Sequence, residues 1–293
     1  MNNSNTNKML RIAVQSKGRL NEDTMNLLAE AGIKVGSSKR TLLVESSNFP
    51  IEVLYLRDDD IPQTVADGVA DIGIVGENEF VERGFDANVV KRLGFSKCRL
   101  SLAIPKAIEY NGLEWFNGKK IATSYPGILQ NFSKEKGLDI DVHVIQGSVE
   151  IAPGIALADG IFDIVSSGST LVSNNLKEVE VVMKSEALLI GNKNLENDPD
   201  KKAILDELLF RIDAVRTAED KKYVLMNAPS DKVAEITKVL PGIKSPTVMP
   251  LATEGWSSIH TVLDEKRFWE IIGQLKQLGA EGILVLPIEK MIL

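Results

Sequence analysis

The feature that most constrains the fold is the alternation of short apolar runs with helical patterns along residues 10–192. Each apolar run has the length of a buried strand, and the stretches between them repeat apolar residues at helical spacing. This order is typical of α/β proteins with a mainly parallel sheet. The first unit is expected to have strands at 10–15, 51–56 and 71–76, a helix at 21–33 capped by Asn21, and a helix at 58–70 with Pro62 in its first turn.

A second unit repeats the same order further along the chain. Residues 99–105 lead out of the first unit, and residues 178–192 bring the chain back to it. Between them we expect a strand, loop and helix at 119–137, a strand at 141–147, a helix at 148–161 and a strand at 162–168. The sequence therefore predicts two α/β lobes, the second inserted into the first, with a cleft between them.

Two segments of similar sequence, 66–78 and 158–170, bear on where a ligand binds. Aligned, they bring Asp67, Gly68, Asp71, Ile72 and Gly76 into step with Asp159, Gly160, Asp163, Ile164 and Gly168. In this alignment a glycine-containing loop follows a strand in each lobe, at the end where open parallel sheets bind ligands. The alternative is generic βα geometry, in which glycine after a helix and an apolar strand are common.

The two loops differ in chemistry. The later loop places four hydroxyl groups around Gly168, from Ser166, Ser167, Ser169 and Thr170. Small residues let backbone N–H groups converge, and hydroxyls add donors without bulk, which suits a phosphate. The earlier loop, 76–80, offers acids and is expected to lie opposite. Asp163, before the hydroxyl loop, either belongs to this site or caps a turn.

A basic turn is a second candidate for binding an anion. Lys17, Gly18 and Arg19 lie between an expected strand and an expected helix start. Two positive charges, a glycine and exposed N–H groups at one place would suit a phosphate. The alternative is a solvated turn.

An acidic run follows Arg57, at residues 58–60. Asp60 is expected to cap a helix and to contribute about 1 kcal/mol. The three acids together would alternatively support a hydrated Mg²⁺ through water. The sequence contains neither a P-loop nor a dinucleotide-binding glycine fingerprint.

Composition argues against several classes of function. The net charge of -7 and the pI of about 5.1 leave no general basic field to attract nucleic acid or an anionic membrane. The single cysteine, Cys98, excludes an internal disulfide and a cysteine metal cluster, and two histidines are too few for a histidine-rich metal site. The polar N-terminal segment and the lack of a long apolar run predict a cytoplasmic protein.

Several segments together resemble the long form of ATP phosphoribosyltransferase, the first enzyme of histidine biosynthesis. They run in the family's order through nearly all of the chain: LRIAVQSKGRL, LRDDDIPQTVADGVADIGIVGEN, CRLSLAIP, KKIATSYPGIL, GSVEIAP, DIVSSGSTL and LGAEGILVLPIEKM. The resemblance implies condensation of ATP with phosphoribosyl pyrophosphate (PRPP) to give phosphoribosyl-ATP and pyrophosphate, with Mg²⁺ as cofactor. It also implies feedback inhibition by histidine and a homo-oligomer, a hexamer in equilibrium with a dimer.

The family fold resembles two periplasmic-binding-protein lobes around a cleft, with a C-terminal regulatory domain. The expected bounds are 1–104 and 185–222 for catalytic lobe I, 105–184 for catalytic lobe II and 223–293 for the regulatory domain. Within the last, strands at 222–229, 247–252, 257–263 and 282–289 and helices at 231–240 and 267–279 give the ferredoxin-like order βαββαβ. A domain that only mediates assembly is the alternative.

The resemblance also assigns residues to roles. Glu150, near the ribose hydroxyls, and Asp163 are the candidate catalytic carboxylates. The PRPP loop would comprise Asp163, Ser166, Ser167, Gly168, Ser169 and Thr170. The charges of ATP or pyrophosphate would be met by Lys17, Gly18, Arg19, Arg57 and Arg99. Histidine would bind beside Ser245, Thr247 and Ala252.

Two other classes of protein share parts of this pattern. A solute-binding protein has the same lobes and cleft, but it releases its ligand unchanged and normally carries an export signal. A deaminase of similar architecture would carry a cofactor on Cys98, whereas a buried structural cysteine is the commoner case. The sequence leaves open the general base, the Mg²⁺ ligands and the recognition of adenine.

Overall fold

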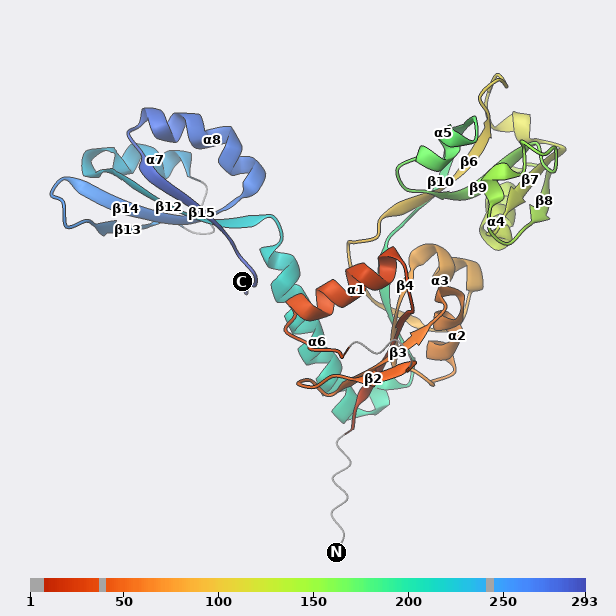
Figure 1. The fold of residues 1–293 in the computed structure, drawn as a ribbon, viewed down its shortest axis with the longest axis horizontal. Helices are drawn as coiled ribbons and strands as arrows, with labels where there is room; N and C mark the ends of the chain where they lie inside the picture. Colours follow the sequence, from red (N-terminus) through yellow and green to blue (C-terminus); the bar gives the residue numbers. More distant parts are fainter. Residues whose placement is uncertain (1–7, 37–40, 241–244) are drawn as a thin grey trace, which may run out of the picture. The chain divides into compact units, whose positions relative to one another are not determined.

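The computed structural model describes residues 8–36, 41–240 and 245–293 (Figure 1). Its contacts define two compact units. The first comprises the described residues up to Asn26 together with Ile33–Leu205, and the second comprises Leu27–Gly32 and Asp206–Leu293. Residues 1–7, on which the expected absence of an export signal rests, lie outside the described ranges. Within those ranges no helix is both long and apolar enough to cross a membrane.

The first unit contains two mixed sheets, and the first of these, with its helices, forms lobe I. Its elements are β1 Leu10–Gln15, α1 Arg19–Glu30, whose last residues from Leu27 belong to the second unit, then β2 Leu43–Glu45, β3 Ile51–Leu56, α2 Ile61–Ala66, β4 Ile72–Gly76, α3 Glu77–Arg83, β5 Asn88–Arg92 and β11 Ala187–Gly191. The strand order is β2-β3-β1-β4-β11-β5, and β1 runs parallel to β3 and β4. Strands β1 and β4 are nearly continuous buried apolar runs, as strands covered on both faces usually are.

The second sheet and its helices form lobe II. Its elements are β6 Cys98–Pro105, β7 Lys119–Thr123, α4 Pro126–Lys136, β8 Ile140–Val144, β9 Gly160–Val165, α5 Ser169–Ser173 and β10 Leu176–Ser185. The strand order is β10-β6-β9-β7-β8, with β7 parallel to both of its neighbours. Phe116 and Phe162 are fully buried in its core. The chain passes between the two sheets after β5 and again after β10, so the expectation of two α/β lobes is confirmed.

The second unit carries a third sheet. Its elements are α6 Pro199–Ala218, whose first residues belong to the first unit, then β12 Lys221–Pro229, α7 Val233–Val239, β13 Thr247–Pro250, β14 Trp256–Asp264, α8 Glu265–Gln277 and β15 Glu281–Pro287. The strand order is β13-β14-β12-β15 and every pairing is antiparallel. Met226, Ile259, Phe268 and Leu275 lie in a core between the sheet and its helices. The βαββαβ order confirms the ferredoxin-like expectation.

The strand pairing corrects the register of the internal repeat. The Asp71 N–H donates to the Arg11 carbonyl at 3.0 Å, and the Asp71 side chain accepts the Arg11 N–H at 2.8 Å. Asp159 makes the same contacts with Lys120, accepting its N–H at 2.9 Å. Asp71 therefore corresponds to Asp159, not to Asp163. The sequence alignment was displaced by four residues because each segment contains two aspartates four residues apart, at 67 and 71 and at 159 and 163.

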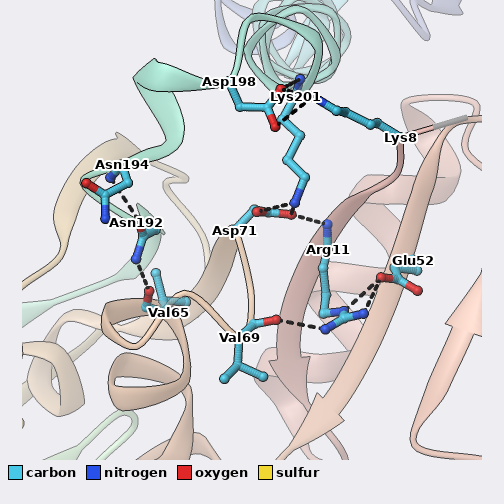
Figure 2. A network of polar contacts seen from close by, with 10 residues as sticks. All are labelled: Lys8, Arg11, Glu52, Val65, Val69, Asp71, Asn192, Asn194, Asp198 and Lys201. Atoms are coloured by element: carbon cyan, nitrogen blue, oxygen red, sulfur yellow. Dashed lines mark hydrogen bonds and ion pairs between the residues drawn. The ribbon is translucent and has the colours of Figure 1, made fainter. Parts of the chain in front are cut away.

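Asp71 is a structural residue at the start of β4 (Figure 2). Its two carboxylate oxygens lie 2.7 and 2.9 Å from the Nζ of Lys201, in the first turns of α6. Arg11, which donates its backbone N–H to Asp71, extends its guanidinium to Glu52 on β3 at 2.7 Å. Lys8 pairs with Asp198 just before α6, at 3.1 Å. These contacts join four segments that are distant in sequence.

Three local predictions were wrong. No α-helix forms at 148–161: a short 3₁₀ turn, Val149–Ile151, is followed by turns, because Pro153 and Gly154 interrupt the helix and Ala156 has a φ of +58°. The first helix begins at Arg19, so Asn21 lies inside it and donates to the Gln15 carbonyl at 2.6 Å. The helix expected at 58–70 begins as a 3₁₀ turn and is helical only over Ile61–Ala66.

Candidate functional site

The hydroxyl loop connects β9 to α5 and lines a cavity of about 140 Å³, here called the loop cavity. Gly168 has a φ of +80°, in the left-handed region that favours glycine. Ser167 Oγ and Ser169 Oγ are hydrogen-bonded at 3.0 Å, which orients both hydroxyls. The polar residues that line the cavity are Glu150, Asp163, Ser166, Ser167, Gly168 and Thr170. The structure thus brings the two candidate carboxylates and most of the hydroxyl loop together.

Asp163 has the environment of a perturbed acid. It lies within β9, on the face that Ile161 and Val165 bury in the core of lobe II. Burial, reinforced by the charge of Glu150, raises the pKa of Asp163 to about 6, against a hydrogen bond of 2.8 Å from the Ile164 N–H. The turn-capping alternative is wrong, because Asp163 lies in a strand. Its carboxyl can gain or lose a proton near neutral pH.

Arg99 on β6 is fixed beside the hydroxyl loop. Its Nε and Nη2 donate to the two oxygens of Glu178 at 2.5 and 2.6 Å, and its Nη1 donates to the Ser166 carbonyl at 3.0 Å. Ser101 also donates to Glu178, at 2.6 Å. The Arg99 guanidinium lowers the pKa of Glu178, which stays ionised. A bidentate pair of this kind fixes the direction of the guanidinium. Glu178 was missed by the sequence reasoning.

A second cavity of about 420 Å³, here called the hinge pocket, lies where the chain crosses between the two sheets. Its lining residues are Glu77, Arg92, Lys97, Cys98, Arg99, Ser166, Lys184, Ser185 and Glu186. Arg99 and Ser166 join this pocket to the hydroxyl loop. Arg92 is engaged by Glu77 and Glu186, whereas Lys97 and Lys184 are exposed. Positive charge therefore lies directly beside the loop cavity.

The basic turn lies near the hinge pocket. Burial raises the pKa of the Cys98 thiol, and a hydrogen bond to Ser185 and the charge of Arg19 oppose that rise. Arg19 is therefore close enough to Cys98 to act on it. Lys17 and Gly18 are exposed, and Gly18 has a φ of +96° at the start of α1. A half-buried thiol with a raised pKa is a poor attachment point, which argues against the deaminase alternative.

Arg57 does not line either cavity. It pairs with Asp59 at 3.2 Å, and Arg83 approaches the same oxygen at 3.6 Å. The other oxygen of Asp59, Oδ1, is buried without a hydrogen-bond partner among the described residues. Asp60 makes no side-chain capping bond, so the cap expectation is wrong.

The acidic segment 76–80 meets lobe II through Tyr125. The Tyr125 hydroxyl accepts a hydrogen bond from Asn78 Nδ2 at 3.1 Å and is also hydrogen-bonded to Glu79. Burial raises the pKa of Tyr125 and of Glu79, and the charge of Asp163 adds to the rise at Tyr125. The sequence reasoning missed Tyr125, which follows β7 and so lies beside the strand that bears Asp163.

The three residues expected near histidine surround the edge strand of the third sheet. Thr247 begins β13 and pairs with His260 on β14, while Ser245 precedes the strand and Ala252 follows it. All three are exposed. His260 is held by the Tyr223 hydroxyl at 2.6 Å and by Ser258 at 3.0 Å.

Known proteins match both units. A family model described as ATP phosphoribosyltransferase matches residues 57–214, and one described as HisG, C-terminal domain matches residues 218–290. The ATP phosphoribosyltransferase of Phocaeicola vulgatus is 78% identical over 285 residues, covering 97% of this chain and 100% of that protein. That of Cytophaga hutchinsonii is 58% identical over 284 residues, covering 97% and 99%. The solved ATP phosphoribosyl transferase (HisG:HisZ) complex from Thermotoga maritima aligns with a TM-score of 0.59 and 30% identity, over 70% of this chain and 98% of that chain.

Proposed function

The chain belongs to the ATP phosphoribosyltransferase family, whose activity is the first step of histidine biosynthesis, and from this premise we propose how its own residues carry out the reaction. The enzyme transfers the phosphoribosyl group of PRPP to N1 of ATP and releases pyrophosphate. The observation that carries the proposal is the loop cavity, where four hydroxyl-bearing or glycine residues and two carboxylates surround one small space. We assign the ribose 5-phosphate to the hydroxyl loop and the ribose hydroxyls to the vicinity of Glu150.

In the proposed reaction the bond from ribose C1 to the pyrophosphate oxygen breaks, and its electron pair leaves with pyrophosphate. The lone pair of adenine N1 forms the new bond to C1. Because N1 is a weak nucleophile, C1 must become electron-poor, and ionised Asp163 and Glu150 stabilise the positive charge that develops there. Arg19 and Arg99 stabilise the departing pyrophosphate, and holding both reactants in line supplies much of the acceleration. The proposal requires no covalent intermediate.

Mg²⁺ is part of the proposal. No group of three or more acids, histidines or cysteines within the described residues is arranged to hold a metal ion. Mg²⁺ is commonly held by one or two carboxylates together with substrate phosphates, which fits an ion that enters with ATP or PRPP. Asp59 offers a carboxylate oxygen, Oδ1, that is buried and lacks a partner among the described residues. The ion would supply charge neutralisation on the departing pyrophosphate.

We assign regulation to the C-terminal domain. The Thermotoga structure is a complex of HisG with a second protein, HisZ, whereas the present chain carries a ferredoxin-like domain of its own. In our proposal histidine binds beside β13 and inhibits the reaction. The enzyme works in the cytoplasm as a homo-oligomer, a hexamer in equilibrium with a dimer, without nucleic acid or membrane as a partner.

The direct test is product formation. With ATP, PRPP and Mg²⁺ the protein should release pyrophosphate and form phosphoribosyl-ATP in equal amounts, and omission of either substrate should abolish both products. Chromatography with phosphate detection measures the two products in one sample. Recovery of ATP and PRPP unchanged would favour a solute-binding protein and contradict the proposal.

A further inference from the structure

The two lobes touch through α3 and α4, where Glu82 lines neither the loop cavity nor the hinge pocket. Glu82, in the last turn of α3, reaches the first turn of α4. Its Oε1 accepts a hydrogen bond from the Gly127 N–H at 2.8 Å, and its Oε2 accepts one from the Ile128 N–H at 2.9 Å. One carboxylate of lobe I therefore holds two backbone donors of lobe II.

This contact satisfies donors that have no acceptor within their own helix. The first N–H groups of a helix lack intrahelical partners, and an anion beside them interacts favourably with the helix dipole. The N-cap residue of α4, Tyr125, makes no side-chain capping bond, so Glu82 takes this role from the other lobe. The fit is close, because a Cβ on Gly127 would lie 3.1 and 3.3 Å from the two Glu82 oxygens.

A buried set of contacts strengthens the same junction. Asn78 in the first turn of α3 donates to the Tyr125 hydroxyl at 3.1 Å and accepts from Ser185 Oγ at 2.9 Å. All three side chains are buried. A buried polar group that loses its partner is costly, so this network favours one arrangement of α3 against the start of α4.

We propose that Glu82 is a positioning residue for the transfer reaction. Its two hydrogen bonds to the N-terminus of α4, here called the Glu82 clasp, hold β9, which carries Asp163, in place against lobe I. The chain of contacts is short: α4 follows β7, and β7 pairs from Ile121 to Thr123 with β9, which carries Asp163. A shift of α4 relative to α3 is therefore a shift of Asp163 relative to Arg19 in lobe I.

This role has a kinetic signature. The loop cavity, to which the ribose 5-phosphate is assigned, is lined only by residues of lobe II, so this part of PRPP binding does not depend on Glu82. The transfer step, by contrast, requires groups from both lobes to be aligned on one pair of reactants. Loss of the clasp should therefore lower kcat by a much larger factor than it raises the dissociation constant of PRPP. The kinetic part of the inference rests on the proposed function.

Two variants disrupt the clasp, one in each lobe. Glu82→Gln removes the negative charge and places an amide N–H₂ donor against a backbone N–H donor. Gly127→Ala adds a Cβ that pushes the Glu82 carboxylate away. We expect each to lower kcat by about 10- to 100-fold, the effect of a misalignment of about 1 Å. Because both act on one contact, the double variant should be scarcely worse than either single variant. Glu135→Gln, at the exposed far end of α4, is the matched control and should retain wild-type kcat.

Hydrogen exchange gives a readout that does not depend on the reaction. In the wild type the amides of Gly127 and Ile128 should exchange slowly, and Glu82→Gln should accelerate exchange in a peptide spanning 125–136 while the Glu135→Gln protein exchanges as the wild type does. Calorimetry with PRPP and steady-state kinetics complete the set. Unchanged exchange, unchanged kcat in both clasp variants, or a fall in PRPP affinity equal to the fall in kcat would each overturn the proposal. An inactive wild type with the expected exchange pattern would instead refute the proposed reaction and leave the clasp supported.

Discussion

At the scale of residues, the same side chain does different work according to its environment. Asp71 and Asp159 each accept one backbone N–H at the start of a strand, whereas Asp163, in the interior of β9, faces the loop cavity beside Glu150. Burial, next to a second carboxyl, raises the pKa of Asp163. This marks Asp163 as the acid whose ionisation can affect the reaction.

Replacement of Asp163 by asparagine should separate stability from activity. The folded protein retains the Asp163 proton up to about pH 6, whereas the unfolded chain releases it near 3.8. The stability that protonation contributes is therefore lost as the pH rises from about 4 to 6, a cost of up to about 3 kcal/mol at pH 7.5. Asp163→Asn should accordingly unfold at higher urea concentration than the wild type at pH 7.5, with the difference shrinking toward pH 4.

The same variant should lose activity. In the wild type kcat/KM should rise through an apparent pKa of about 6, because the ionised carboxylate stabilises the transition state. Asp163→Asn should lack this rise and have a kcat/KM lower by about 100-fold. A pH profile identical to that of the wild type would show that Asp163 does not act on the reaction.

Gly168→Val should weaken PRPP binding selectively. Gly168 has a φ of +80°, a conformation that a β-branched residue rarely adopts, and a side chain there would disturb the N–H groups and hydroxyls assigned to the phosphate. Loss of one charged hydrogen bond should raise the PRPP dissociation constant by about tenfold or more, with ATP affinity little changed. Calorimetry measures both. Gly137→Val, at a φ of +68° with no atom near its Cβ, carries similar backbone strain away from the loop and should bind PRPP normally.

At the scale of elements, local patterns predicted the strands well and some helices poorly. The strands at 10–15 and 51–56 occur with the predicted bounds. The helix at 148–161 fails because Pro153 and Gly154 outweigh the apolar spacing around them. The register of the repeat failed for another reason: two alignments share similar letters, and only the pairing of β4 with β1 and of β9 with β7 distinguishes them.

The candidate site was predictable where its residues are adjacent in sequence and not where the fold brings them together. The hydroxyl loop is one continuous segment, so its chemistry was visible. Glu178 lies 79 residues from Arg99, and Tyr125 lies 47 residues from Asn78. No local pattern distinguishes a strand glutamate that fixes an arginine from one that faces solvent. The partnership of Glu178 with Arg99 is set by the register of β10 against β6.

Asp71 and Asp159 provide a matched pair for the energetics of a strand start. Both accept a backbone N–H, but the Asp71 side chain is 14% exposed and holds Lys201, whereas the Asp159 side chain is 46% exposed and lies 4.0 Å from Lys119. Asp71→Ala leaves the part-buried ammonium of Lys201 without its carboxylate partner, and it should lower the free energy of unfolding by about 2–4 kcal/mol. Asp159→Ala should cost less than about 1.5 kcal/mol. Urea unfolding measures both, and equal losses would show that the Lys201 pair contributes nothing.

At the scale of the whole molecule, the candidate active site lies within the first unit and the ferredoxin-like domain lies within the second. The loop cavity, the hinge pocket and the Glu82 clasp are all formed by residues between Glu77 and Glu186. Helix α6 contributes residues to both units. The proposed regulation by histidine therefore requires a second site whose occupancy changes the equilibrium of the first, and the coupling must be reciprocal.

Thr247→Arg tests this regulatory arrangement in the full chain. Thr247 is exposed on the edge strand β13 and pairs with His260, so a long charged side chain there should cost little stability while filling the proposed effector site. We expect activity without histidine to remain at the wild-type level and the histidine concentration for half inhibition to rise by about tenfold or more, the usual scale of an allosteric coupling. Glu281→Arg, on the opposite edge strand β15, is the control and should remain sensitive. Inhibition assays, with light scattering to confirm assembly, decide the outcome. A Thr247→Arg protein that assembles normally and responds to histidine as the wild type does would show that the effector site lies elsewhere, and a wild type insensitive to histidine would favour a domain that serves only in assembly.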